Sequence, residues 1–119
     1  MSMRTFRVTV RGVFDGLTED QRAALLADAA AHDVLRAAFT PEGTLTYDIA
    51  ARPAFVFRFS ATGEEEEDIL EATERAEAAA EAWLTERGYG FRNLRSSAED
   101  LSQAPLSKRQ RRAARSAKA

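Results

Sequence analysis

The sequence predicts an α+β fold of the ferredoxin-like sandwich type, with an antiparallel sheet of four or five strands and two helices on one face. Several short segments alternate apolar and polar residues with period two, which is typical of half-buried strands. Two other segments carry apolar residues at helical spacing. The order strand, helix, two or three strands, helix, strand matches the split βαβ pattern. This domain is expected over residues 1–97, followed by a polar linker and a basic tail over residues 98–119.

Four segments have the alternation expected of strands: residues 5–12, 44–50, 54–62 and 89–96. In each of them one face carries the large apolar side chains. These sets are Phe6, Val8 and Val10; Leu45, Tyr47 and Ile49; Phe55, Phe57 and Phe59; and Tyr89 and Phe91. The predicted core is built from members of these sets and the second helix, because burying each large apolar side chain stabilises the fold by about 1.5–3 kcal/mol. Its residues are Phe6, Val8, Val10, Tyr47, Phe55, Phe57, Phe59 and Trp83.

Two helices are predicted on either side of the central strands. Thr18 and Gln21 have the spacing of a capping box, which predicts a first helix from Glu19 to about Ala30. The second helix is expected over residues 64–87, because its apolar residues recur every three or four positions and Gly88 is a typical stop residue.

Residues 32–40 are compatible with two structures. They could prolong the first helix. The Pro41-Glu42-Gly43 sequence favours a turn, and a hairpin around it would make Arg36–Thr40 a short fifth strand. We favour the hairpin.

The residues that alternate with the core set define the opposite face of the sheet. Four arginines fall there and are the candidate binding residues: Arg7, Arg11, Arg58 and Arg92. Neighbouring guanidinium groups repel one another, and a bound anion relieves this repulsion. The face is compatible with a solvated or internally paired surface, with a homodimer interface, and with a site for a small anionic ligand or nucleic acid; among the functional interpretations we favour the homodimer.

The charge of the chain is divided between two segments. The first 107 residues hold eleven Arg and nineteen acids, a net charge of −8. The last twelve hold six basic residues and no acid, and these are the candidate nucleic-acid contacts: Lys108, Arg109, Arg111, Arg112, Arg115 and Lys118. Such a tail predicts weak, salt-sensitive contact with phosphates rather than sequence-specific binding.

Catalytic chemistry has few candidates. His32 is the only His, and it would be tested first together with Tyr47, Asp48 and Arg58. The absence of Cys excludes disulfides and thiol nucleophiles, and one His with scattered acids predicts no metal site. No cofactor is predicted. No segment approaches the roughly 18 apolar residues of a membrane span, and no secretion signal is visible, so we expect a cytoplasmic protein without membrane contact.

Several stretches resemble a family of small actinobacterial proteins that contain a domain of unknown function. The resemblance covers about Thr5 to Arg95, and its most specific parts read FDGL, HDVLRAAFTPEG and LTYD. It implies one small domain and no particular activity.

The sequence therefore predicts a small homodimeric binding or interaction module. One alternative is a small dimeric enzyme with a pocket between sheet and helices. Another is a nucleic-acid-associated protein that acts through its basic tail.

Overall fold

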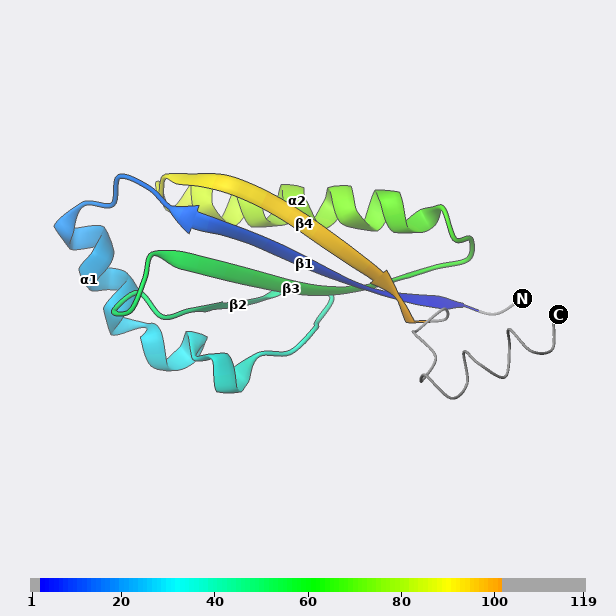
Figure 1. Cartoon of the computed structure of the whole chain (residues 1–119), viewed down its shortest axis with the longest axis horizontal. Coiled ribbons are helices and arrows are strands. Elements are labelled where there is room, and N and C mark those ends of the chain that lie inside the picture. Colours follow the sequence, from blue (N-terminus) through cyan, green and yellow to red (C-terminus); the bar gives the residue numbers. More distant parts are fainter. Residues whose placement is uncertain (1–2, 102–119) are drawn as a thin grey trace, which may run out of the picture.

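The computed structural model describes residues 3–101, which form an α+β fold with one four-stranded antiparallel sheet and two α-helices (Figure 1). Two short 3₁₀ helices, η1 and η2, follow α1. Neither α-helix within residues 3–101 combines the length and the hydrophobicity of a membrane span. The elements are β1 (Arg4–Phe14), α1 (Glu19–Ala27), η1 (Ala29–His32), η2 (Val34–Arg36), β2 (Thr44–Tyr47), β3 (Ala54–Gly63), α2 (Asp68–Glu86) and β4 (Phe91–Asp100).

The strands lie in the order β2-β3-β1-β4, and every neighbouring pair is antiparallel. The long strands β1 and β3 form the centre, with Val8 opposite Phe59 and Val10 opposite Phe57. The long helix α2 packs along one face of the sheet, whereas the short α1 lies beyond one end of the sheet (Figure 1). The face opposite α2 is called the open face below.

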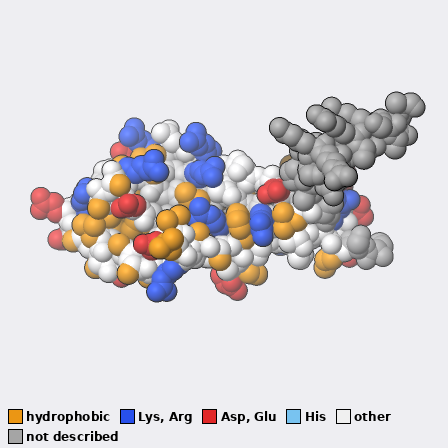
Figure 2. All heavy atoms as spheres, turned by 60° about the horizontal axis from the view of Figure 1, so that its bottom comes forward, with side chains coloured by type: hydrophobic (Ala, Val, Ile, Leu, Met, Phe, Trp, Pro, Cys, Tyr) orange, Lys and Arg blue, Asp and Glu red, His pale blue; other side chains and the backbone are white. Residues whose placement is uncertain are grey.

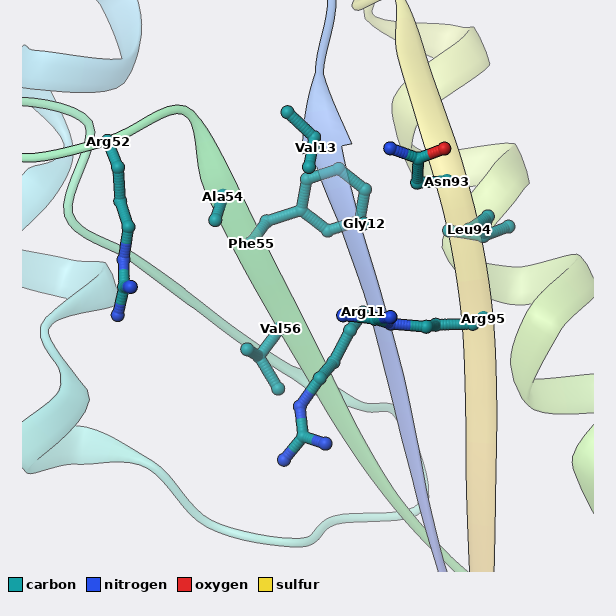
Figure 3. A pocket seen from close by; sticks show the side chains of 10 residues that line it. All are labelled: Arg11, Gly12, Val13, Arg52, Ala54, Phe55, Val56, Asn93, Leu94 and Arg95. Atoms are coloured by element: carbon teal, nitrogen blue, oxygen red, sulfur yellow. The ribbon is translucent and has the colours of Figure 1, made fainter.

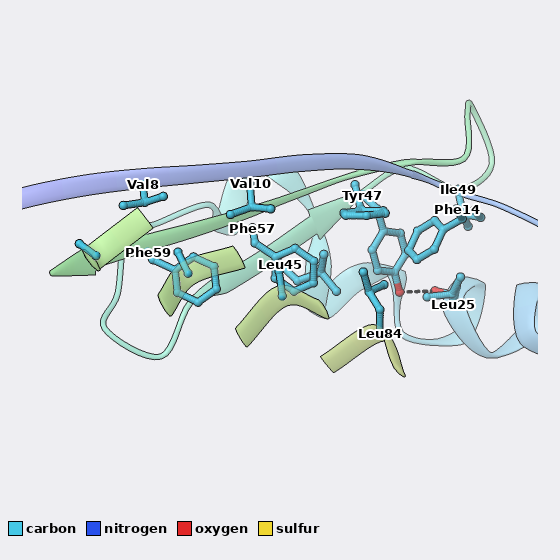
Figure 4. Close-up of a cluster of buried hydrophobic side chains, with 14 of the residues drawn as sticks. Val8, Val10, Phe14, Leu25, Leu45, Tyr47, Ile49, Phe57, Phe59 and Leu84 are labelled. Carbon is cyan, nitrogen blue, oxygen red and sulfur yellow. Dashed lines mark hydrogen bonds between the residues drawn. The ribbon is translucent and has the colours of Figure 1, made fainter. Parts of the chain in front are cut away.

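The core lies between the sheet and α2, as the alternation predicts (Figure 4). Phe6, Val8 and Val10 of β1 are fully buried, and the three Phe of β3 are at most 6% exposed. The helix α2 faces them mainly with alanines, which let the helix approach the large aromatic side chains of the strands closely. Its buried residues are Ala72, Ala76, Ala80 and Leu84.

The capping box of α1 is confirmed. Thr18 Oγ1 accepts a hydrogen bond from the Gln21 N–H at 3.1 Å, and Gln21 Oε1 accepts one from the Thr18 N–H at 3.0 Å. The helix ends at Ala27, earlier than expected, and Leu25 is its one buried residue. The Tyr47 hydroxyl donates to the Leu25 carbonyl at 2.6 Å and so ties α1 to β2 (Figure 4).

The predicted short strand at Arg36–Thr40 is wrong. Val34–Arg36 is a 3₁₀ helix, and only Thr40 makes a β-bridge, to Phe59 of β3. The predicted turn does form, since the Gly43 N–H donates to the Thr40 carbonyl and Gly43 has a φ of 90°. Within residues 3–101, no strand pairs with the edge of β2 that faces away from β3. His32 lies against that edge instead, with its Nδ1 3.0 Å from the Leu45 carbonyl oxygen.

The start of α2 and the end of β4 also differ from those predicted. The helix α2 begins at Asp68, whose carboxylate accepts the N–H groups of Glu64 and Glu65 at 2.9 and 3.0 Å, so the preceding acids form a turn. The last strand continues to Asp100, through residues that the sequence predicted to be linker. Arg4 of β1 binds the Asp100 carboxylate at 2.9 Å, which anchors this polar end of the strand.

Candidate functional site

Three arginines surround a hollow of about 550 Å³ on the open face (Figure 3). We call it the arginine hollow. Its volume falls within the range of about 300–1,000 Å³ that small-molecule sites occupy. The residues that line it are Arg11, Gly12, Val13, Arg52, Ala54, Phe55, Val56, Asn93, Leu94 and Arg95.

Three separate elements position the arginines. Arg11 of β1 and Arg95 of β4 are direct cross-strand partners, so their side chains leave the same face of the sheet. Arg52 comes from the loop between β2 and β3 and lies on the other side of β3 (Figure 3). The sheet thus brings together residues that are more than 40 positions apart in the sequence.

An irregularity between β1 and β4 shapes the hollow. Arg11 pairs with Arg95 and Val13 with Arg92, so two β4 residues lie opposite the single Gly12. Asn93, one of these two, adopts the left-handed conformation with a φ of 57°, which is uncommon for a residue other than Gly. β-Bulges re-aim side chains and are over-represented beside functional sites.

Gly12 is required by close packing behind this bulge. A Cβ atom at position 12 would lie 2.5 Å from Cζ of Phe55, because the Phe55 ring occupies the space that a side chain would need. The Phe55 ring is 1% exposed and belongs to the core, so the apolar floor of the hollow is formed by Val13, Ala54 and Val56. The site therefore combines cationic walls with an apolar floor.

The charged side chains that line the hollow within residues 3–101 are all positive. No carboxylate lines it, and none of its three guanidinium groups forms a hydrogen bond or an ion pair with another part of residues 3–101. The first 107 residues carry nineteen acids against eleven Arg, so this local excess of positive charge is unusual for the chain. Arg side chains gather over one half of the face seen in Figure 2, with hydrophobic and a few acidic side chains between them.

Comparison with protein-family models identifies a matching family. A family of unknown function (DUF6204) covers residues 1–112. The chain belongs to this family. A search of curated proteins found no match, and neither did a search of solved structures.

In this DUF6204 chain, the arginine hollow suits binding better than catalysis. Guanidinium groups stay protonated in proteins, so they attract anions but do not accept protons. Among the described residues, the only other polar side chain in the lining is that of Asn93, and none of them contributes a hydroxyl, carboxylate or imidazole group. The hollow therefore supplies charge and hydrogen-bond donors but no nucleophile or general base.

A second hollow of about 480 Å³ adjoins the first, and both are lined by Arg52, Ala54 and Val56. Its far wall is formed by α1, η1 and η2, and its other polar residues are Thr46, Asp33, Asp48 and Arg58. The Arg58 guanidinium donates to Thr46 Oγ1 at 2.7 Å. The remaining lining residues are Leu26, Ala29, Val34, Tyr47, Ile49 and Ala50.

The structure spreads the four predicted binding arginines along the open face. Arg11 lines the arginine hollow, and Arg58 lines the second hollow. Arg7 lies over the Phe39 ring, 4.9 Å from its centroid, and Arg92 lies opposite Val13 beyond the bulge. Sequence reasoning missed Arg52, which follows no strand pattern.

Arg95 was also missed. It falls within the predicted strand over residues 89–96, but strict alternation from Phe91 places it on the core face, and the bulge turns it to the open face. The alternation of Arg95, Ser97 and Glu99 continues that strand along the open face, and it is the signal that could have identified this residue.

The four residues proposed for catalysis lie in two places. The His32 and Tyr47 rings pack against each other, with centroids 5.2 Å apart, on the side of the sheet that holds the core. Burial and the nearby Asp28 charge raise the pKa of Tyr47 to about 12, so its hydroxyl stays protonated at neutral pH. Asp48 and Arg58 line the second hollow, to whose lining Tyr47 also contributes.

The six basic tail residues, Lys108 to Lys118, lie outside the described residues. Within residues 3–101, no group of three or more His, Asp or Glu side chains is placed to hold a metal ion.

Proposed function

We propose that this protein is a binding module that holds an anionic ligand on the open face of its sheet. The arginine hollow supports the proposal. It gathers three guanidinium groups without a carboxylate on a body whose net charge is strongly negative. Guanidinium groups bind carboxylates and phosphates through paired, charge-assisted hydrogen bonds.

The arrangement of Arg11 and Arg95 explains why an anion would bind in the hollow. Like charges directly opposite each other on a sheet destabilise the pair, and here the protein supplies no counter-charge in the hollow. A bound anion would remove this repulsion and would satisfy donors that otherwise rely on water. The favourable free energy of binding thus includes the relief of an unfavourable contact in the free protein.

Titration calorimetry with inorganic pyrophosphate tests the proposal. We expect one molecule to bind per chain and the affinity to fall at least about tenfold in Arg95→Gln, since a charge-assisted bidentate contact contributes about 1.5–3 kcal/mol. Arg22→Gln is the matched control, because Arg22 is exposed on α1 and lines neither hollow. Equal affinities in the two variants would contradict the proposal.

The finer fold class belongs to the same proposal. We assign the domain to the ferredoxin-like sandwiches, and the strand order β2-β3-β1-β4 with α2 across one face supports this. In such a sandwich the face without helices is available to ligands or partners.

A homodimer through the open face stays a prediction. Back-to-back packing of two such faces would bring the arginines of two chains towards each other, so it requires an intervening anion or an offset that separates the hollows. Light scattering at two concentrations, with wild type and Arg58→Glu, tests it. A dimer that Arg58→Glu abolishes would support the interface, and a monomer in both proteins would contradict it.

Nucleic-acid contact through Lys108–Lys118 also stays a prediction. Its affinity should fall steeply with salt, and it should be lost when residues 108–119 are deleted. Binding that survives this deletion would place the contact elsewhere.

A further inference from the structure

The ligand class can be narrowed if the proposed function holds. We infer that the two hollows together form one elongated site for an amphipathic anion, with the charged head group in the arginine hollow and an apolar body in the second hollow. The inference rests on the proposed function and adds the apolar half of the ligand.

The first step is continuity. Arg52, Ala54 and Val56 line both hollows, so the two adjoin across β3. The shared residues Ala54 and Val56 leave the strand on the open face, and each is partly exposed. A ligand lying across β3 would therefore contact apolar side chains in passing from one hollow to the other.

The second step is the apolar wall. Leu26 of α1 is 43% exposed and Val34 of η2 is 65% exposed, although both are large hydrophobic residues. They line the second hollow, and Ile49 and Ala50 also contribute to its lining. Exposed apolar side chains that converge on one depression indicate a surface that a ligand or partner covers.

The third step is the charge of the second hollow, which is balanced where the first is not. Its lining holds the two carboxylates Asp33 and Asp48 together with Arg58 and the shared Arg52, and Asp33 Oδ1 already accepts the Leu35 N–H at 2.8 Å. Arg58 already donates to Thr46. This half of the site thus offers no net charge for a second anionic group, and its exposed apolar residues favour a hydrocarbon chain or an aromatic ring.

Together these steps predict how a ligand lies. A phosphate or carboxylate group would sit between Arg11 and Arg95, with Arg52 flanking it. The attached chain would pass over Val56 and end against Val34 and Leu26. Alkyl phosphates test this placement directly, because head group and chain length vary independently.

The experiment measures the affinity of the full-length protein for inorganic phosphate, butyl phosphate and octyl phosphate, all below the concentration at which micelles form. Octanol is the uncharged control. We expect the affinity to rise about twofold for each methylene, since a half-open hollow buries about half of the area that a closed cavity would. Octanol should bind at least about tenfold more weakly than octyl phosphate.

Two variants test where the alkyl chain of the ligand binds. Val34→Ser should reduce the affinity for octyl phosphate and leave that for inorganic phosphate unchanged. The control Leu70→Ser changes a residue of α2 that is 67% exposed and lines no part of either hollow, and it should alter neither affinity. Both sites are largely exposed, so the variants should fold.

Each outcome has a distinct meaning. Equal affinities for the three phosphates would overturn the inference and leave the anion site standing, whereas no binding of any phosphate would overturn the proposed function as well. Octanol binding as tightly as octyl phosphate would also overturn the inference, because the head group would then contribute nothing. If the affinity still rose with alkyl chain length in Val34→Ser as it does in the wild type, the alkyl chain would bind elsewhere, and this would contradict the elongated site.

Discussion

Arg11 and Arg95 lie directly opposite each other on the open face, on the neighbouring strands β1 and β4. Neither guanidinium group is paired with a carboxylate within residues 3–101. The protein thus keeps two like charges side by side in a hollow, even though acids outnumber basic residues in its first 107 positions.

This pairing predicts that Arg95→Gln stabilises the free protein. Removing one of two opposed charges should raise the free energy of unfolding by about 0.5 kcal/mol at low ionic strength, because like-charged cross-strand pairs are unfavourable by roughly this amount. Urea denaturation measures the change. The gain should shrink as salt is added, and Arg22→Gln, outside the hollow, should show none. Destabilisation by Arg95→Gln at low salt would mean that the arginine has a favourable contact.

Gly12→Ala tests the packing behind the bulge. The added methyl group would lie 2.5 Å from the Phe55 ring, so we expect a loss of about 1–3 kcal/mol in the free energy of unfolding, as in other overpacked cores. The double variant Gly12→Ala, Phe55→Leu removes the clash. Its cost should be smaller than the sum of the two single costs, and simple additivity would contradict the proposed contact.

Tyr47→Phe tests the bond that holds α1 to the sheet. The last carbonyls of a helix lack partners within the helix, and the Tyr47 hydroxyl satisfies that of Leu25. Removing a buried hydrogen bond of this kind should cost about 1–3 kcal/mol. Tyr89→Phe is the control, because the hydroxyl of Tyr89 has no hydrogen-bond partner in residues 3–101, and its effect should stay within about 0.5 kcal/mol. Equal losses in the two variants would contradict this account.

The same residue predicts alkaline sensitivity. Burial and the Asp28 charge raise the pKa of Tyr47 from 10.0 to about 12, which means that folding favours the neutral phenol. The corresponding stability is fully present below pH about 10 and is lost as the pH rises towards about 12. Absorbance in the tyrosinate band should show a transition well above pH 10. Tyr47→Phe should remove this transition, and a transition that persists unchanged in Tyr47→Phe would contradict the assignment.

Much of the fold follows from local sequence patterns. Simple alternation of apolar and polar residues predicts the strand that contains Phe6, Val8 and Val10. The capping-box spacing of Thr18 and Gln21 predicts the start of α1. These signals are reliable because they depend only on neighbours in the chain. The prediction of a fifth strand was wrong because it depends on a contact between residues that are not neighbours in the chain. His32 occupies the edge of β2, and that contact joins residues 13 positions apart.

The site depends still more on long-range structure. Arg11 was identified from its strand face, but its partner Arg95 reaches that face only because of the bulge in β4, which no local pattern predicts. The strand also continues beyond its predicted end. This end of β4 carries small and polar residues, because a strand at the edge of a sheet can face water and needs few large apolar side chains. Arg52 lies in a loop, where no periodicity indicates the direction of a side chain.

The most direct test of the anion site is amide chemical-shift mapping of the full-length protein during titration with inorganic pyrophosphate. The tail and the hollow are both cationic, so the location of the shifts separates them. The account predicts that the largest changes occur in residues 11–13, 52–56 and 93–95, and that Arg95→Gln abolishes them. Changes confined to residues 108–118, or spread evenly over all exposed arginines, would contradict the arginine hollow as a ligand site.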